Sequence, residues 1–203
     1  MTPRACIVVL MVMFAFACAG TAHAVETGES AMTFQAGGAV LGGKLGELFS
    51  PDFAYGVNMA FGITDYLGIF ADALYAVHQQ ADQDKYGTLN FAHGTIAIGP
   101  RGGYTWDHFV LYGGAAPVAS LMTYKARYSA GTGTDEDETD AHGFGGMAEI
   151  GADAFVSSSL TVGLSGRVTI VSTDLEFAHG ADVDNLVETY TWYAGLLRVT
   201  LIF

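Results

Sequence analysis

The sequence predicts an all-β protein, an eight-stranded antiparallel up-and-down transmembrane β-barrel. Three observations support this fold. The chain is 51% hydrophobic and only 14% charged, yet beyond its first 24 residues no apolar run reaches the ~20 residues of a transmembrane helix. Eight segments alternate between large apolar residues and small or polar ones, as strands with one lipid-facing side do. Every charge that we place at membrane depth within these segments falls on the side of the smaller residues.

The first 24 residues are predicted to be a cleaved secretory signal. A lone Arg4 precedes an apolar run over 5–19, and the run ends in the small-residue triplet Ala-His-Ala at 22–24. A membrane anchor is the alternative, but the run is short for one and no basic cluster follows it. We therefore expect cleavage near Ala24, a mature barrel domain over 25–203, and location in the bacterial outer membrane.

Cysteine and charge content limit the cofactors and partners. Cys6 and Cys18 both lie in the signal, so the mature chain has no thiol for a disulfide or a metal, and no cofactor is expected. A lipoprotein acylated at Cys18 is an alternative, although the preceding residues lack the usual branched aliphatic. The formal net charge of −13 becomes more negative when Arg4 is lost, which argues against nucleic acid as a partner.

The eight predicted strands have the length that a tilted spanning strand needs. They cover 31–41, 53–63, 67–77, 91–104, 109–128, 143–156, 160–172 and 188–203. The links between them alternate between short ones (64–66, 105–108, 157–159) and long polar ones (42–52, 78–90, 129–142, 173–187). Tight periplasmic turns and long outer loops are typical of outer-membrane barrels, so we expect the long loops outside the cell.

The charges inside the strands indicate which side faces lipid. A soluble barrel would bury its large apolar residues and point polar ones outward. Here six charged residues share the side of the small residues, which we interpret as the lumen, and should form an interior ion network: Asp72, Arg101, Glu149, Asp153, Arg167 and Arg198. A charge facing lipid near mid-bilayer costs about 2–4 kcal/mol, so their absence from the other side predicts an inside-out barrel.

Two further groups of residues carry expectations about the barrel wall. Pro100 and Pro117 fall within strands of a barrel that has no free edge, so bulges are expected there. Four large residues fall on the inward side, and we expect them to fill the lumen: Phe70, Leu74, Met147 and Trp192.

The chain resembles the small outer-membrane β-barrel superfamily of OmpA-like, OmpX-like and opacity-like surface antigen barrels. The resemblance lies in Phe-Gly-Ile-Thr-Asp-Tyr-Leu-Gly-Ile at 61–69, in Gly-Gly-Met-Ala-Glu-Ile-Gly-Ala-Asp at 145–153 with the strand from Leu160, and in a final strand ending on Phe203. It implies that barrel-assembly machinery recognises the terminal alternating row: Tyr193, Leu197, Val199, Leu201 and Phe203. It also implies outer-membrane lipid and lipopolysaccharide as surroundings, and a monomer. Members of this superfamily differ widely in function.

No motif in the sequence assigns an enzymatic activity or a metal. The acidic run over 135–140 lacks the glycine and final glutamate of an EF-hand, so a solvated loop is expected, with weak divalent-cation binding as the alternative. Asp182 and Asp184 fail in the same way. Histidines 78, 93, 142 and 179 have no adjacent serine, which disfavours a catalytic His–Ser pair.

Three functions fit these features. The first is a non-enzymatic surface barrel that displays its loops, in envelope integrity, adhesion or surface contact. The second is a narrow passive pore or a conduit for hydrophobic solutes, which would need an unfilled lumen. The third is a lipid-modifying enzyme.

Overall fold

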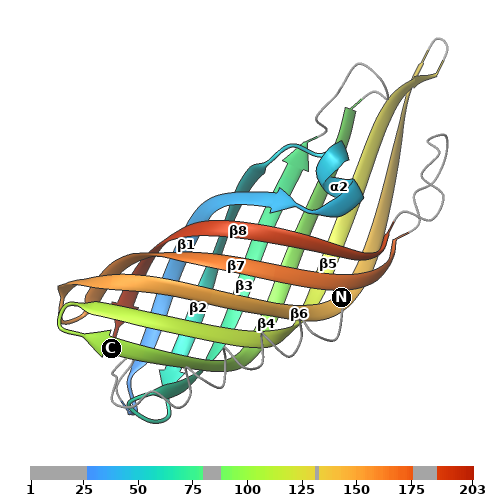
Figure 1. Ribbon diagram of the computed structural model, residues 1–203. Coiled ribbons are helices and arrows are strands. Elements are labelled where there is room, and N and C mark those ends of the chain that lie inside the picture. Colours follow the sequence, from blue (N-terminus) through green and yellow to red (C-terminus); the bar gives the residue numbers. More distant parts are fainter. Residues whose placement is uncertain (1–26, 80–87, 131–132, 176–186) are drawn as a thin grey trace.

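The computed structural model describes residues 27–79, 88–130, 133–175 and 187–203; the predicted signal segment lies outside them. Within these ranges, eight strands and one short helix follow one another (Figure 1): β1 (Ser30–Leu41), α2 (Gly43–Leu48), β2 (Asp52–Gly62), β3 (Leu67–Gln79), β4 (Thr88–Trp106), β5 (Phe109–Ala130), β6 (Gly133–Ser157), β7 (Leu160–Leu175) and β8 (Val187–Ile202).

Each strand pairs antiparallel with the next, and β1 pairs with β8 to close the barrel. In the closing ladder Phe34 lies opposite Val199, and the backbone of Phe203 bonds to that of Ser30. The predicted eight-stranded antiparallel barrel is confirmed. Within the described ranges, no helix is long and apolar enough to cross a membrane.

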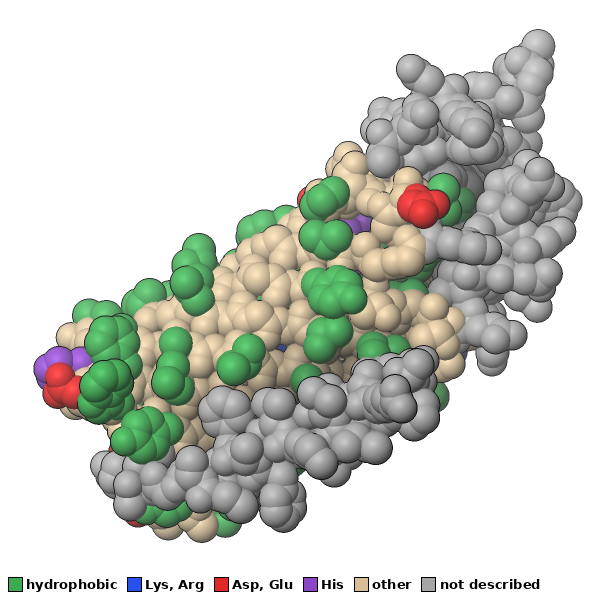
Figure 2. Space-filling view, in the orientation of Figure 1, with side chains coloured by type: hydrophobic (Ala, Val, Ile, Leu, Met, Phe, Trp, Pro, Cys, Tyr) green, Lys and Arg blue, Asp and Glu red, His purple; other side chains and the backbone are tan. Residues whose placement is uncertain are grey.

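The outer wall carries the large apolar side chains. Along β2 the predicted alternation holds, with Phe53, Tyr55, Val57, Met59 and Phe61 all exposed. The face seen in Figure 2 carries hydrophobic side chains along its length, and its acidic side chains lie towards the two ends. In water such a surface would be an extensive unpartnered apolar patch, whereas in a bilayer it is the lipid-facing belt. The barrel is therefore of the outer-membrane type.

The lumen is filled by side chains that change in character along the barrel axis. Charged and amide side chains lie near the middle of the strands, and aromatic and histidine side chains lie towards the end where the long links are. We call this the loop end, and the opposite end the turn end. The four large residues expected inside are all buried: Phe70, Leu74, Met147 and Trp192.

Two of the turns at the turn end are shorter than predicted, whereas the β2–β3 turn spans 63–66 and is one residue longer than predicted. Residues 105–106 still belong to β4, so only Asp107 and His108 connect β4 to β5. Asp107 has a φ of 53°, the left-handed backbone that two-residue hairpin turns require and that Asp tolerates. Residue 157 likewise belongs to β6, next to a register shift between Phe155 and Ser157.

Strand residues extend into all four predicted long loops, and two of these loops contain mostly regular structure. The link over 42–52 contains α2, and most of the link over 129–142 is strand, because β5 continues to Ala130 and β6 begins at Gly133. The expectation that the acidic run over 135–140 is a loop is therefore wrong. It forms the beginning of β6, paired residue by residue with β5.

The bulges expected at the two prolines do not occur. Ala97 pairs with Val118 and Arg101 with Gly114, so the register of β4 against β5 is the same on both sides of the prolines. Between these pairs, residues 98–100 and 115–117 are not paired with each other. The missing N–H groups therefore interrupt the ladder without adding a residue to either strand.

Candidate functional site: the lumen and the loop end

Arg167 lies at the centre of the interior charges. Its Nη1 and Nη2 donate to the two carboxylate oxygens of Asp72 at 2.6 and 2.8 Å, a bidentate geometry in which both charges are well compensated. Its Nε donates to Glu149 at 3.0 Å, and its Nη2 donates to the same oxygen. The side chains of Arg167 and Asp72 are each 1% exposed.

Arg198 extends the network along the wall of β8. Its Nη1 donates to the second oxygen of Glu149 at 2.7 Å, so Glu149 joins the two arginines. The Nε of Arg198 lies 3.6 Å from an oxygen of Asp153. These contacts place five of the six predicted charges in one connected group.

Arg101 is placed differently from the expectation. Among the described residues it has no carboxylate within 4 Å, and its guanidinium lies over the Tyr112 ring, 3.6 Å from the centroid. Arg198 lies over the same ring at 4.6 Å. Tyr112 therefore occupies the position in which a carboxylate was expected, since an aromatic face attracts a cation in a desolvated site.

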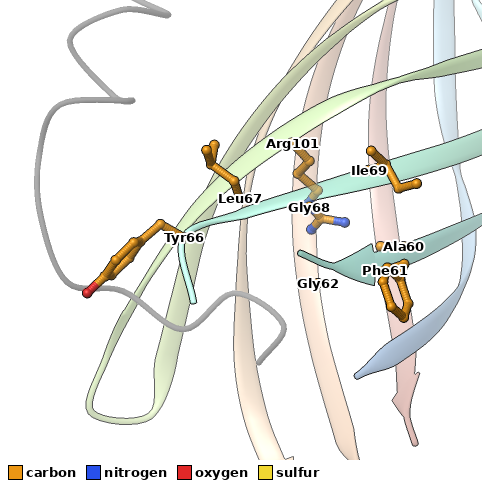
Figure 3. A pocket seen from close by; sticks show the side chains of 8 residues that line it. All are labelled: Ala60, Phe61, Gly62, Tyr66, Leu67, Gly68, Ile69 and Arg101. Atoms are coloured by element: carbon orange, nitrogen blue, oxygen red, sulfur yellow. The ribbon is translucent and has the colours of Figure 1, made fainter. Parts of the chain in front are cut away.

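A small pocket lies beside Arg101 at the turn end. It opens between β2 and β3, where Gly62 and Gly68 carry no side chain (Figure 3). Several buried polar atoms in this half of the lumen have no partner among the described residues, including the Nε of Arg101 and the Oη of Tyr112. Buried polar groups of this kind are ordinarily satisfied by ordered water.

Sequence reasoning missed the two amides that complete the site around Asp72. The Nε2 of Gln35 and the Nδ2 of Asn58 donate to one oxygen of Asp72 at 2.7 and 3.2 Å. Both are inward positions on β1 and β2, so their alternation could have revealed them. Because the prediction of the interior network considered charged side chains, it did not include these neutral amides.

The network closes the lumen at mid-depth. The side chains of Arg167, Arg198 and Glu149 are 1%, 0% and 7% exposed, so they are closed to bulk water from both ends of the barrel. Glycines on the inward face, such as Gly151, give no free passage, because a Cβ there would meet the Tyr112 hydroxyl. This interior is packed as in small eight-stranded barrels.

The histidines are distributed over both ends of the barrel. His78 and His93 are buried at the loop end of the lumen and face each other, with 3.3 Å between their Nε2 atoms. His142 is exposed, and His179, like Asp182 and Asp184, lies outside the described residues. The Ser120 hydroxyl contacts the Tyr190 hydroxyl rather than a histidine. Among the histidines that the structure describes, this arrangement does not present a His–Ser pair to lipid.

The hairpin of β5 and β6 carries the acidic run. Its outward side chains form cross-strand pairs at the loop end: Lys125 Nζ lies 2.9 Å from Glu138, and Thr123 donates to Asp140 at 2.7 Å. Within the described ranges no group of three or more His, Cys, Asp or Glu side chains is arranged to hold a metal ion.

The terminal row predicted to guide assembly faces outward along β8 and ends with Phe203 at the turn end. All five of its side chains are exposed: Tyr193, Leu197, Val199, Leu201 and Phe203. A role in recognition by assembly machinery stays a prediction.

Solved structures with the same fold are outer-membrane barrels. Neisserial surface protein A is 13% identical with a TM-score of 0.57, covering 86% of this chain and 97% of that one. The outer membrane protein OprG from Pseudomonas aeruginosa is 13% identical with a TM-score of 0.54, covering 90% and 98%. Ail, the attachment invasion locus protein of Yersinia pestis, is 9% identical with a TM-score of 0.52, covering 87% and 99%. At these identities the likeness shows the fold alone.

No protein-family model matches the chain. No curated protein matches it either. The class of protein is thus defined by the fold: a small eight-stranded outer-membrane barrel.

Proposed function

We propose that this chain is a non-enzymatic surface barrel of the bacterial outer membrane that displays its loop end for contact with molecules outside the cell. The observation that carries this proposal is the length of β5 and β6. They contain 22 and 25 residues, whereas a spanning strand needs about 9–11. The outward apolar side chains end at Leu121 and Phe144, so the remainder of the hairpin extends beyond the lipid-facing belt.

The closed lumen supports display over transport. A passive pore needs a continuous aqueous path, and the buried network around Arg167 lies across that path. The solved barrels support the same class of function only in general terms: Ail bears the name of an attachment and invasion protein, and the neisserial protein that of a surface protein.

The test compares cells that display the full chain with cells displaying a variant in which residues 126–137 are replaced by an Asn-Gly turn. We expect equal surface levels of folded barrel, and weaker adhesion of the variant cells to one another and to surfaces coated with extracellular-matrix protein. Stepwise currents from the purified full chain in planar bilayers, or equal adhesion of the two cell types, would contradict the proposal.

A further inference from the structure

The loop end of the lumen is covered by the segment 42–51, which contains α2 (Figure 1). We call this segment the α2 lid. Leu45 and Phe49 from the lid are 2% and 3% exposed, and the Phe49 ring lies 5.7 Å from the ring of Phe91 on the inward face of β4. Backbone hydrogen bonds hold the two ends of the lid to β8 and β3. The lid is therefore packed into the mouth of the barrel.

A chain of polar groups links the lid to the inner wall. The Nδ1 of His78 lies 3.4 Å from the carbonyl oxygen of Ser50 in the lid. The Nε2 of His78 faces the Nε2 of His93 at 3.3 Å. The Nδ1 of His93 lies 3.4 Å from the Tyr190 hydroxyl. His78 and His93 are 0% and 1% exposed, so these contacts are made without bulk water.

The neutral form of this chain has only one consistent direction. A carbonyl oxygen accepts and never donates, so the Nδ1 of His78 carries its hydrogen and its Nε2 is bare. The Nε2 of His93 must then donate to it, which leaves the Nδ1 of His93 to accept from the Tyr190 hydroxyl. The contact of His93 with His78, the residue that bonds to the Ser50 carbonyl in the lid, therefore requires His78 to lack a hydrogen on Nε2.

One added proton can be accommodated, but two cannot. A proton on the Nδ1 of His93 turns the Tyr190 hydroxyl towards Ser120, 3.1 Å away, and Ser120 can donate to the carbonyl of Gly94 at 3.3 Å. A second proton puts N–H groups on both Nε2 atoms, which then point at each other. It also places two like charges in a buried site.

The surroundings of the pair compensate little of this charge. The groups that face it are Asp52 from β2, Tyr190 and Trp192 from β8, Ser120 from β5 and Ser50 from the lid. Asp52 is the one carboxylate among them. The nearest ring contact of His93 is the edge-to-face one with Trp192, at 4.6 Å.

We propose that acidification opens the α2 lid: when both histidines are protonated, the contact between His78 and His93 breaks and the segment 42–51 leaves the mouth of the barrel. The pH outside the barrel thereby determines whether the loop end of the lumen is accessible.

Trp192 is a built-in reporter for the test. The chain has two tryptophans; Trp106 is 69% exposed at the turn end, and Trp192 is 1% exposed against His93. The full-length mature chain carrying Trp106→Phe, folded in detergent micelles, is titrated from about pH 7.5 to about pH 2, because two buried neighbouring histidines take up a second proton only well below the ordinary histidine pKa of about 6.5. Emission of Trp192 and its quenching by acrylamide are recorded, and gel mobility monitors the folded barrel.

We expect acid to lower the emission and to raise acrylamide quenching severalfold, with the folded mobility unchanged. His78→Gln and His93→Gln should each abolish this transition, because two facing charges can no longer form. His142→Gln, which changes an exposed histidine outside the pair, should leave it intact. The proposal is overturned if Trp192 stays inaccessible throughout, if either single variant keeps the transition, or if the barrel loses its folded mobility over the same pH range.

Discussion

Replacing Arg167 by leucine should destabilise the barrel strongly. The substitution removes both bonds to Asp72 and both to Glu149 and leaves two carboxylates buried without their principal cation. Breaking a buried ion pair by removing one partner costs about 3–5 kcal/mol. We therefore expect Arg167→Leu to lower the free energy of unfolding by about that amount, measured by reversible urea unfolding of the barrel in lipid vesicles.

The structure also specifies which second substitution should restore stability. Asp72→Asn in the Arg167→Leu background removes the charge that has lost its partner and keeps an acceptor for Gln35 and Asn58, so it should recover part of the loss. Asp153→Asn should not, because the described cation beside Asp153 is Arg198 rather than Arg167. Glu149→Gln is expected to recover less than Asp72→Asn, since Arg198 still compensates Glu149.

Arg101→Leu is the matched control. It deletes the same side chain from the same lumen, but it breaks a stacking contact with Tyr112 instead of an ion pair. The expected loss is about 0.5–2 kcal/mol. The reasoning would be refuted if Arg167→Leu cost no more than Arg101→Leu, or if Asp153→Asn restored stability as well as Asp72→Asn.

Three further predictions concern packing, assembly and topology. Gly145→Ala should cost about 1–3 kcal/mol, because its Cβ would meet a backbone carbonyl of β7, whereas Gly166→Ala has open space and should cost less in the same urea assay. Deleting Phe203 should lower outer-membrane levels without blocking export; normal levels in membrane fractions would count against its role. Protease added to intact cells should cut within 129–142 or 173–187 and spare the three short turns, as fragment masses would show; cuts confined to the turns would invert the topology.

The strands were predictable because successive residues face lipid and lumen in turn, so that large apolar side chains alternate with small or polar ones. In β2 and β7 this alternation is complete, so the predicted bounds differ from the structure by at most three residues. In β6 the alternation between apolar and polar residues stops at residue 142, because the strand leaves the lipid-facing belt there and both of its faces become polar. Cross-strand pairs such as Lys125 with Glu138 support the hairpin there, and an ion pair across two strands has no trace in hydrophobic periodicity.

The α2 lid and the histidine pair were beyond sequence reasoning for different reasons. The helix has six residues, of which Gly43 and Gly46 are poor helix formers, and burial of Leu45 supports it instead of intrinsic propensity. His78 and His93 lie fifteen residues apart on paired strands, and their partners Ser120 and Tyr190 come from β5 and β8. Only the register of the closed barrel brings these groups together.

For the interior charges, the sequence predicted which residues face the lumen but did not predict which partner each of them contacts. The inward positions of Asp72, Glu149 and Arg167 follow from alternation alone. The stacking of Arg101 on Tyr112 does not, because it depends on which rotamers fit above Gly151. Alternation assigns a side chain to a face, whereas pairing within that face is decided by packing in three dimensions.

The two prolines on the outer wall give the barrel an uneven stiffness. The unchanged register sets Pro117 across from Ile98 and Pro100 across from Ala115, so both missing donors fall within one stretch of the β4–β5 boundary. A closed barrel resists distortion through backbone bonds distributed around its whole circumference. Here residues 98–100 of β4 and 115–117 of β5 are not paired with each other, so only the backbone bonds on either side of this gap hold the two strands together. Lateral pressure from the bilayer will therefore bend the wall most easily along this line, and the barrel's cross-section will be most easily deformed in one fixed direction relative to the α2 lid.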